Sequence, residues 1–134
     1  MYRVLMLEDE EDLVRYLPMH FKEKGLETVA TTSITEALES FTKEAFDIVL
    51  LDIMMPPTED MDAKQLDYGR ETGVEVARRM KSIKPDVPIV ALTVVNDQEI
   101  RARMRTAGIV EIISKPSDPD QIADALLRSV RTKK

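Results

Sequence analysis

Five polar side chains of the sequence stand directly after short apolar runs, or close one of them. Two acids follow the run at 2–7, one acid follows 47–51, a threonine closes 87–93 and a lysine comes just after 110–113. In that order they are Glu8, Asp9, Asp52, Thr93 and Lys115. A carboxylate in such a place is costly to bury unless it is paired or used. If the runs are neighbouring parallel strands, these side chains meet at the edge of the sheet where such folds bind ligands.

The chemistry of this set is that of phosphoryl transfer. Carboxylates about 4–6 Å apart either raise a pKa or attract a cation, and Mg²⁺ prefers their oxygens together with water. A metal, the ammonium of Lys115 and the hydroxyl of Thr93 together could hold the oxygens of a phosphoryl group. Asp52 would then be free to act as a carboxylate nucleophile.

Several other functions are excluded or disfavoured by composition. The chain has no cysteine and one histidine, so disulfides, a thiol nucleophile and a zinc cluster are not available, and no glycine-rich nucleotide-binding motif is present. The formal net charge of −6 disfavours direct binding of nucleic acid. No apolar stretch approaches the roughly 18–20 residues that cross a bilayer. We therefore expect a cytoplasmic domain without a membrane segment.

Apolar runs alternate with segments of helical period along the 134 residues. Strands are predicted at 2–7, 27–30, 47–51, 87–93 and 110–113. Helices are predicted at 12–24, from the capping-box pattern Ser33-x-x-Glu36, from Thr72-x-x-Glu75 to Lys81, from Asn96-x-x-Glu99 to Gly108, and from Asp118 to about Arg131. This alternation predicts one α/β domain with a parallel sheet and helices on both faces.

Four segments of the sequence carry a resemblance to a known family. They are "VLMLEDEEDL", "FDIVLLDIMMP", "VPIVALT" and "IISKP". Together, and in this order, they resemble the signature segments of two-component response-regulator receiver domains. The match runs from Tyr2 to about Arg131, so residues 1–134 are expected to form a single receiver domain. The resemblance implies a flavodoxin-like, doubly wound sheet of five parallel strands in the order 2-1-3-4-5, with five helices.

The resemblance also implies a metal site and a phosphoacceptor. Asp52 would be the phosphoacceptor and a ligand of Mg²⁺. Asp9 would bind Mg²⁺ directly, Glu8 would assist through a water molecule, and the backbone carbonyl of Met54 would be a further ligand. The neighbouring acids, Glu10 among them, are expected to be ordinary residues of a helix N-terminus.

Three further residues receive roles from the resemblance. Thr93 would bond a phosphoryl oxygen and report its presence by moving. Lys115 would pair with the phosphate. Pro116 would hold the following turn, through a cis peptide bond.

The function implied is that of a signalling switch and not of an enzyme. The switch would assist only its own phosphorylation and dephosphorylation. A sensor histidine kinase or a histidine phosphotransfer protein would donate the phosphoryl group. The response would be a change in the surface of helix four, strand five and helix five, through which a homodimer could also form. The downstream protein is unknown. The 134 residues include no output domain, which fits either a stand-alone receiver or part of a longer regulator.

Two alternatives remain open. One is a receiver-like binding module that is not phosphorylated, which the intact acidic, threonine and lysine positions disfavour. The other is a Mg²⁺-dependent phosphohydrolase with an aspartyl nucleophile. Such an enzyme often uses a second aspartate two residues after the nucleophile, and that position is Met54.

The chain departs from the family pattern at three places. In typical receivers a glycine follows Pro56 within a few residues, whereas here the best candidate is Gly73, so 57–72 is an enlarged loop. It is either a surface loop or an element that covers the acceptor or selects partners. Ile112 replaces the usual aromatic residue, so the coupling of threonine motion to an aromatic side chain is expected to be altered or absent. Val94 stands where a small residue is common and is expected to slow hydrolysis of the acyl phosphate.

Overall fold

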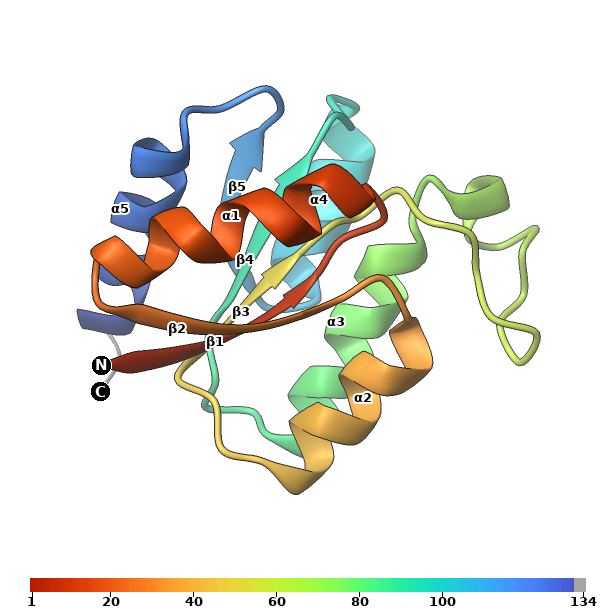
Figure 1. Ribbon diagram of the computed structural model, residues 1–134. Helices are drawn as coiled ribbons and strands as arrows, with labels where there is room; N and C mark the ends of the chain where they lie inside the picture. Colours follow the sequence, from red (N-terminus) through yellow and green to blue (C-terminus); the bar gives the residue numbers. More distant parts are fainter. Residues whose placement is uncertain (132–134) are drawn as a thin grey trace.

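A parallel sheet of five strands forms the centre of the protein, in the order β2-β1-β3-β4-β5 (Figure 1). The computed structural model describes residues 1–131. The strands are β1 (Tyr2–Leu7), β2 (Leu26–Thr31), β3 (Ile48–Leu51), β4 (Ile89–Thr93) and β5 (Ile109–Ser114). All four pairings between neighbouring strands are parallel. The predicted flavodoxin-like strand order is therefore confirmed.

Five α-helices cover the two faces of the sheet. They are α1 (Glu11–Glu23), α2 (Ile34–Lys43), α3 (Thr72–Ile83), α4 (Gln98–Thr106) and α5 (Pro119–Arg131), and a short 3₁₀ helix, η1 (Asp67–Gly69), precedes α3. The core lies in two layers, one beneath α2, α3 and α4 and the other beneath α1 and α5. Successive residues of a strand point to opposite faces, so each central strand supplies both layers. None of the helices within residues 1–131 is long and apolar enough to cross a membrane.

The helix starts follow the sequence only in part. Ser33 caps α2 as predicted, since its side chain accepts a hydrogen bond from a backbone N–H of the first turn. The capping box predicted at Thr72 is wrong, because Thr72 is already helical and its buried hydroxyl has no hydrogen-bond partner. The predicted cap Asn96 is wrong by one residue. Asp97 caps α4 instead, and its carboxylate accepts two backbone hydrogen bonds.

The enlarged loop at 57–72 packs against the body of the domain. It leaves the sheet beyond β3 and projects to one side of α3 (Figure 1). Met61 and Leu66 are 8% and 7% exposed and belong to the core layer beneath α2, α3 and α4. Asp60 forms an ion pair of 2.7 Å with Arg79 of α3. Two apolar side chains therefore anchor the loop, and it ends at Glu71 because Thr72 already belongs to α3.

Replacing Leu66 by alanine is expected to lower the free energy of unfolding by about 2–3 kcal/mol, because removing a buried side chain leaves a cavity in the core. Urea denaturation measures this change. The matched control is Gln65→Ala, which alters the exposed neighbouring side chain and should change the midpoint little. Equal midpoints for the two variants would contradict the packing of the loop.

Candidate functional site

Asp52 and Glu8 lie side by side at the carboxyl edge of the sheet. Leu51 of β3 pairs in register with Leu7 of β1, so the residues that follow each strand are neighbours. The backbone N–H of Asp52 donates to the carbonyl of Leu7 at 2.9 Å. Asp52 is 5% exposed and Glu8 is 2% exposed. The structure therefore brings these two predicted acids together at the centre of the edge.

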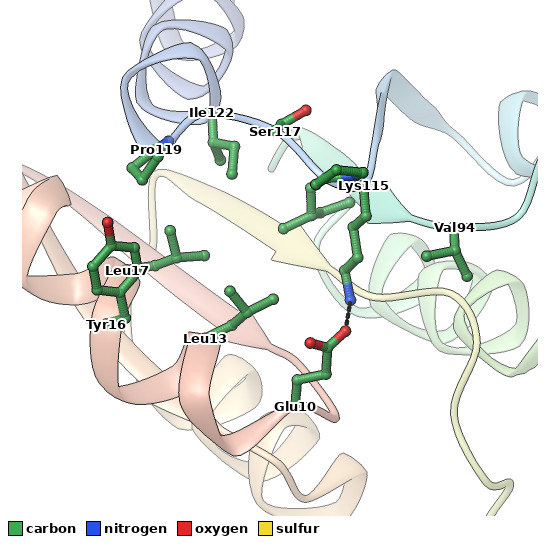
Figure 2. Close-up of a pocket in the computed structure, with 11 residues that line it drawn as sticks. Glu10, Leu13, Tyr16, Leu17, Val94, Lys115, Ser117, Pro119 and Ile122 are labelled. Carbon is green, nitrogen blue, oxygen red and sulfur yellow. Dashed lines mark hydrogen bonds and ion pairs between the residues drawn. The ribbon is translucent and has the colours of Figure 1, made fainter.

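Lys115 reaches the same place from β5. Thr93 pairs in register with the residue before the lysine, and the backbone N–H of Lys115 donates to the carbonyl of Thr93 at 2.9 Å. The Lys115 Nζ atom lies 2.9 Å from Glu8 Oε1, 3.0 Å from Glu10 Oε1 and 3.6 Å from Asp52 Oδ2. Its contact with Glu10 is visible in Figure 2. The ammonium group of Lys115 thus forms ion pairs with three carboxylates.

The charges of this cluster perturb one another. Burial, and next the charge of Glu8, raise the pKa of Asp52 from 3.8 to about 7, although Lys115 opposes the rise. Burial alone would lower the pKa of Lys115, but the hydrogen bond to Glu8 and the charge of Asp52 outweigh it, and the pKa of Lys115 is raised. The site therefore keeps an excess of negative charge beyond what its lysine neutralises. Such an excess favours a bound cation.

The other predicted residues of the site lie around this cluster. Asp9 is exposed, and its backbone lies within hydrogen-bonding reach of the Asp52 carboxylate. The side chain of Met54 is 39% exposed. Thr93 is fully buried, and its Oγ1 accepts a hydrogen bond of 3.1 Å from the backbone N–H of Val95. The peptide bond between Lys115 and Pro116 is cis, as expected.

Carboxylates alone do not form a closed metal site. Across residues 1–131, no group of three or more His, Cys, Asp or Glu side chains is arranged to hold a metal ion. A Mg²⁺ ion bound here would need carboxylates, a backbone carbonyl and water together, a mixture that Mg²⁺ accepts. The residues present fit such an ion, because Asp52 and Glu8 are two buried carboxylates in mutual repulsion.

Two residues matter more than the sequence suggested. Glu10 is not an ordinary helix N-terminal acid, because it forms an ion pair with Lys115 and its backbone N–H donates to Glu8 Oε2 at 2.9 Å. Gly73 packs directly on the backbone that follows β3, where an added Cβ would lie 2.4 Å from the carbonyl oxygen of Asp52 and 2.5 Å from the Cα of Ile53. In the sequence, the only indication for Glu10 was its place in a run of acidic residues. For Gly73, the indication was its match to the glycine that follows Pro56 in typical receivers.

An apolar cavity of about 350 Å³ opens beside the lysine, between α1 and the start of α5 (Figure 2). Leu13 and Tyr16 line it from α1, Pro116 and Ile122 from the other side. Val94 lines it next to Lys115 and is 57% exposed. The approach to the ammonium group is therefore bordered by apolar side chains.

Solved structures with the same fold include several receiver domains. A CheY-like response regulator receiver domain protein from Methanospirillum hungatei matches 99% of this chain and 96% of its own, with a TM-score of 0.85 and 20% identity. The receiver domain of the Francisella response regulator 1452 matches 100% of both chains, with a TM-score of 0.82 and 19% identity. The non-phosphorylated HemR receiver domain from Leptospira biflexa covers 100% of this chain and 98% of its own, with a TM-score of 0.79 and 25% identity. The fold is that of CheY-like proteins.

The profile of the response regulator receiver domain family matches residues 4–127, and the chain belongs to this family. Response regulator SaeR of Staphylococcus epidermidis is 28% identical over 122 residues, which are 91% of this chain and 47% of SaeR. SaeR of Staphylococcus aureus is similar to the same extent. The chain spans about half the length of these curated relatives. Receiver domains are phosphoacceptor switches of two-component signalling, and response regulators partner with sensor histidine kinases.

Proposed function

We propose that Asp52 takes a phosphoryl group from a phosphohistidine of a sensor histidine kinase or a histidine phosphotransfer protein, in the cytoplasm, and that residues 1–134 act as a single receiver domain. The observation that carries this proposal is a carboxylate, 5% exposed at the edge of the sheet, with an ammonium group 3.6 Å away. An oxygen of Asp52 forms the new P–O bond as the P–N bond breaks. The electron pair of that bond returns to the imidazole nitrogen, which takes up a proton.

Asp9, Asp52 and the backbone carbonyl of Met54 would hold Mg²⁺, with Glu8 acting through water. When bound, the ion would offset the negative charge of the carboxylates and of the incoming phosphoryl oxygens. Burial, and next the charge of Glu8, raise the pKa of Asp52, and a bound cation would offset both effects on the ionised carboxylate. The remaining chemistry depends on the side chains of the chain itself.

Lys115 and Thr93 would exchange partners on phosphorylation. Lys115 would turn from the carboxylates to a phosphoryl oxygen. The hydroxyl of Thr93 would leave the N–H of Val95, 3.1 Å away, and donate to another phosphoryl oxygen. Because Val95 lies between β4 and α4, this exchange would move the start of α4. The surface of α4, β5 and α5 would then bind a downstream protein or a second copy of the chain.

The two alternatives predict different chemistry. A phosphohydrolase would turn over a phosphodonor without keeping the phosphoryl group, and Met54 occupies the position where such enzymes often have their acid. A binding module that is not phosphorylated would not react at all. The pairing of Lys115 with Glu8 and Asp52 is compatible with all three functions, so the fate of the phosphoryl group decides between them.

Incubation with Mg²⁺ and a small phosphodonor, followed by intact-mass measurement, tests the proposal. We expect one phosphoryl adduct, labile to hydroxylamine, on the native chain and none on Asp52→Asn. Asp86→Asn, which changes an exposed aspartate, serves as the matched control and should keep the adduct. Turnover of the donor without an adduct would support the hydrolase, and no reaction would support the inert module.

Replacing Val94 by alanine is expected to speed loss of the phosphoryl group about two- to fivefold, since a change of ~0.5–1 kcal/mol in the barrier has that effect. The reason is steric: Val94 borders the approach to Lys115, and a smaller side chain would admit water more readily. Decay of the phosphorylated mass with time measures the rate. An unchanged rate would show that Val94 does not limit access.

A further inference from the structure

The end of the enlarged loop is hydrogen-bonded to residues 53–55, which directly follow Asp52 and form the acceptor segment. The backbone N–H of Met55 donates to the carbonyl of Gly69 at 3.0 Å. The N–H of Gly73 donates to the carbonyl of Ile53 at 2.8 Å. Glu71 lies between these two attachment points. The position of its backbone is therefore set by the residues that directly follow the phosphoacceptor.

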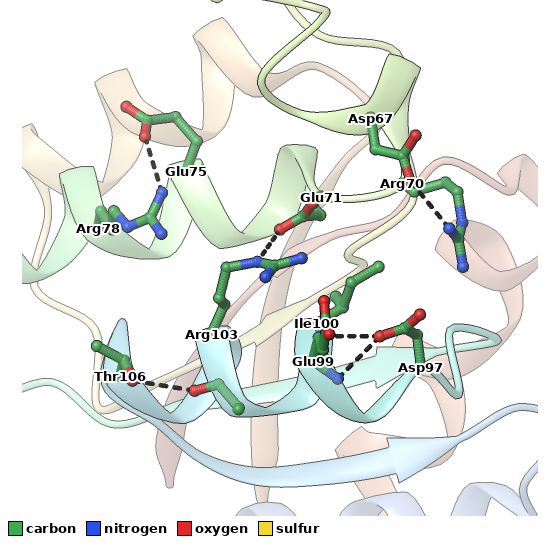
Figure 3. Close-up of polar contacts among 11 residues, drawn as sticks. Asp67, Arg70, Glu71, Glu75, Arg78, Asp97, Glu99, Ile100, Arg103 and Thr106 are labelled. Carbon is green, nitrogen blue, oxygen red and sulfur yellow. Dashed lines mark hydrogen bonds and ion pairs between the residues drawn. The ribbon is translucent and has the colours of Figure 1, made fainter.

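The carboxylate of Glu71 is paired with α4. Its side chain is 11% exposed, and its Oε1 atom lies 2.5 Å from Nε of Arg103 (Figure 3). The hydrogen bond to Glu71 raises the pKa of Arg103. A buried carboxylate that loses its partner is strongly disfavoured, so this pair holds its two elements together. The ion pairs of Asp67 with Arg70 and of Glu75 with Arg78, also drawn in Figure 3, are local contacts three residues apart along the chain.

Helix α4 has few other attachments. It has nine residues, of which only Ile100 and Met104 are buried. Arg101 donates a hydrogen bond of 3.0 Å to Ser114 of β5. With so small an apolar contact, the polar contacts of α4 contribute more to fixing its position. In the Glu71–Arg103 pair the carboxylate is buried, while the Arg103 side chain is 43% exposed. The ion pair of Arg103 with Glu71 is thus one of the main contacts that fix the position of α4 over the sheet.

We propose that the Glu71–Arg103 pair couples the acceptor segment to α4. The enlarged loop is then a mechanical connection, in which residues 53–55 are bonded to Gly69 and Gly73, and Glu71 between them holds α4. This pair provides α4 with a connection to the acceptor segment in addition to the contact of Thr93 with Val95 before α4. The coupling is a property of the unphosphorylated protein. The further statement that phosphorylation acts through this pair rests on the function proposed above.

Amide hydrogen exchange of the unphosphorylated protein tests the coupling. In Arg103→Gln we expect exchange about five- to tenfold faster in α4 and also at the amides of Met55 and Gly73, because coupling between two sites is reciprocal. The matched control is Arg105→Gln, on the same helix and exposed, which should leave Met55 and Gly73 unchanged. Faster exchange confined to α4 would overturn the proposal, since the pair would then be a local clamp only.

A second variant keeps the test independent of the first. Glu71→Gln retains the size of the side chain and a hydrogen-bond acceptor but removes the charge. It should also accelerate hydrogen exchange in α4 and at the amides of Met55 and Gly73. Combining it with Arg103→Gln should add little to either change, because both remove one interaction. Fully additive changes would show that the two residues act separately and would overturn the coupling.

Intact-mass measurement on the same variants separates this proposal from the proposed function. If the native chain forms no adduct while Arg103→Gln loosens Met55 and Gly73, the coupling stands and the phosphoacceptor function fails. If the adduct forms and the exchange at those amides is unchanged in Arg103→Gln, the coupling alone fails. With both correct, phosphorylation changes the exchange of α4 less in Arg103→Gln than in the native chain.

Discussion

Gly73→Ala is expected to lower the free energy of unfolding by about 2–3 kcal/mol and to reduce phosphorylation of Asp52 about tenfold or more. Alanine inside a helix normally stabilises it by about 1 kcal/mol relative to glycine. Here the sign reverses, because the new Cβ would lie 2.4 Å from the carbonyl oxygen of Asp52 and 2.5 Å from the Cα of Ile53. Both are backbone atoms, so the acceptor segment must move to relieve the overlap. Urea denaturation measures the stability, and intact mass measures the adduct.

Gly25→Ala is the control for a glycine replacement away from the site. Gly25 has a φ of +84°, and an added Cβ would meet no atom within 4 Å. Alanine there costs about 1–2 kcal/mol by strain alone and leaves the acceptor in place. We therefore expect lower stability with normal phosphorylation. If Gly73→Ala behaved like Gly25→Ala, the contact of Gly73 with the acceptor segment would have no functional weight.

Asp52→Asn is expected to stabilise the metal-free protein, by about 2–4 kcal/mol at pH 8.5 and by almost nothing near pH 4. The pKa of Asp52 is raised to about 7 in the folded protein, first by burial and then by Glu8. The folded state therefore binds this proton more tightly than the unfolded state, and the native chain loses stability as the pH rises from about 4 through about 7. The asparagine variant lacks that loss. Denaturant midpoints at several pH values, in a chelator, measure the difference.

Added Mg²⁺ should reduce this difference at pH 8.5. A ligand that binds only the folded state stabilises it, by about 2.7 kcal/mol when present at 100 times its dissociation constant. The native chain should gain that stability, while Asp52→Asn, which lacks one proposed ligand, should gain much less. Asp86→Asn, at an exposed aspartate, should behave as the native chain does at every pH. A pH profile of Asp52→Asn parallel to that of the native chain would contradict the raised pKa.

The site was predictable where chain order alone determines position. Parallel strands put their carboxyl ends at one edge, so Glu8, Asp52, Thr93 and Lys115 could be placed together from the apolar runs that precede them. The pairing of Lys115 with Glu10 could not, because an acid at a helix start is ordinary, and only the path of the lysine side chain across the edge makes it a partner.

The fold was less predictable where long-range packing competes with local pattern. The spacing of Thr72 and Glu75 satisfies a capping box, but contacts of the loop with the acceptor segment place the helix start one residue earlier than that pattern requires. A charged loop gave no sign that Met61 and Leu66 enter the core. The ion pair between Glu71 and Arg103 joins residues 32 positions apart, and no local pattern indicates it.

The three-way contact of Lys115 has a consequence for the outer face of the domain. An ammonium group that turns to a phosphate leaves Glu10 without its counterion, and Glu10 stands at the outside of the cluster, 59% exposed. Phosphate arrival would then be accompanied by unmasked negative charge where α1 begins. A protein that docked there on the neutralised surface would meet repulsion once its phosphoryl group had been delivered, and it would depart more readily.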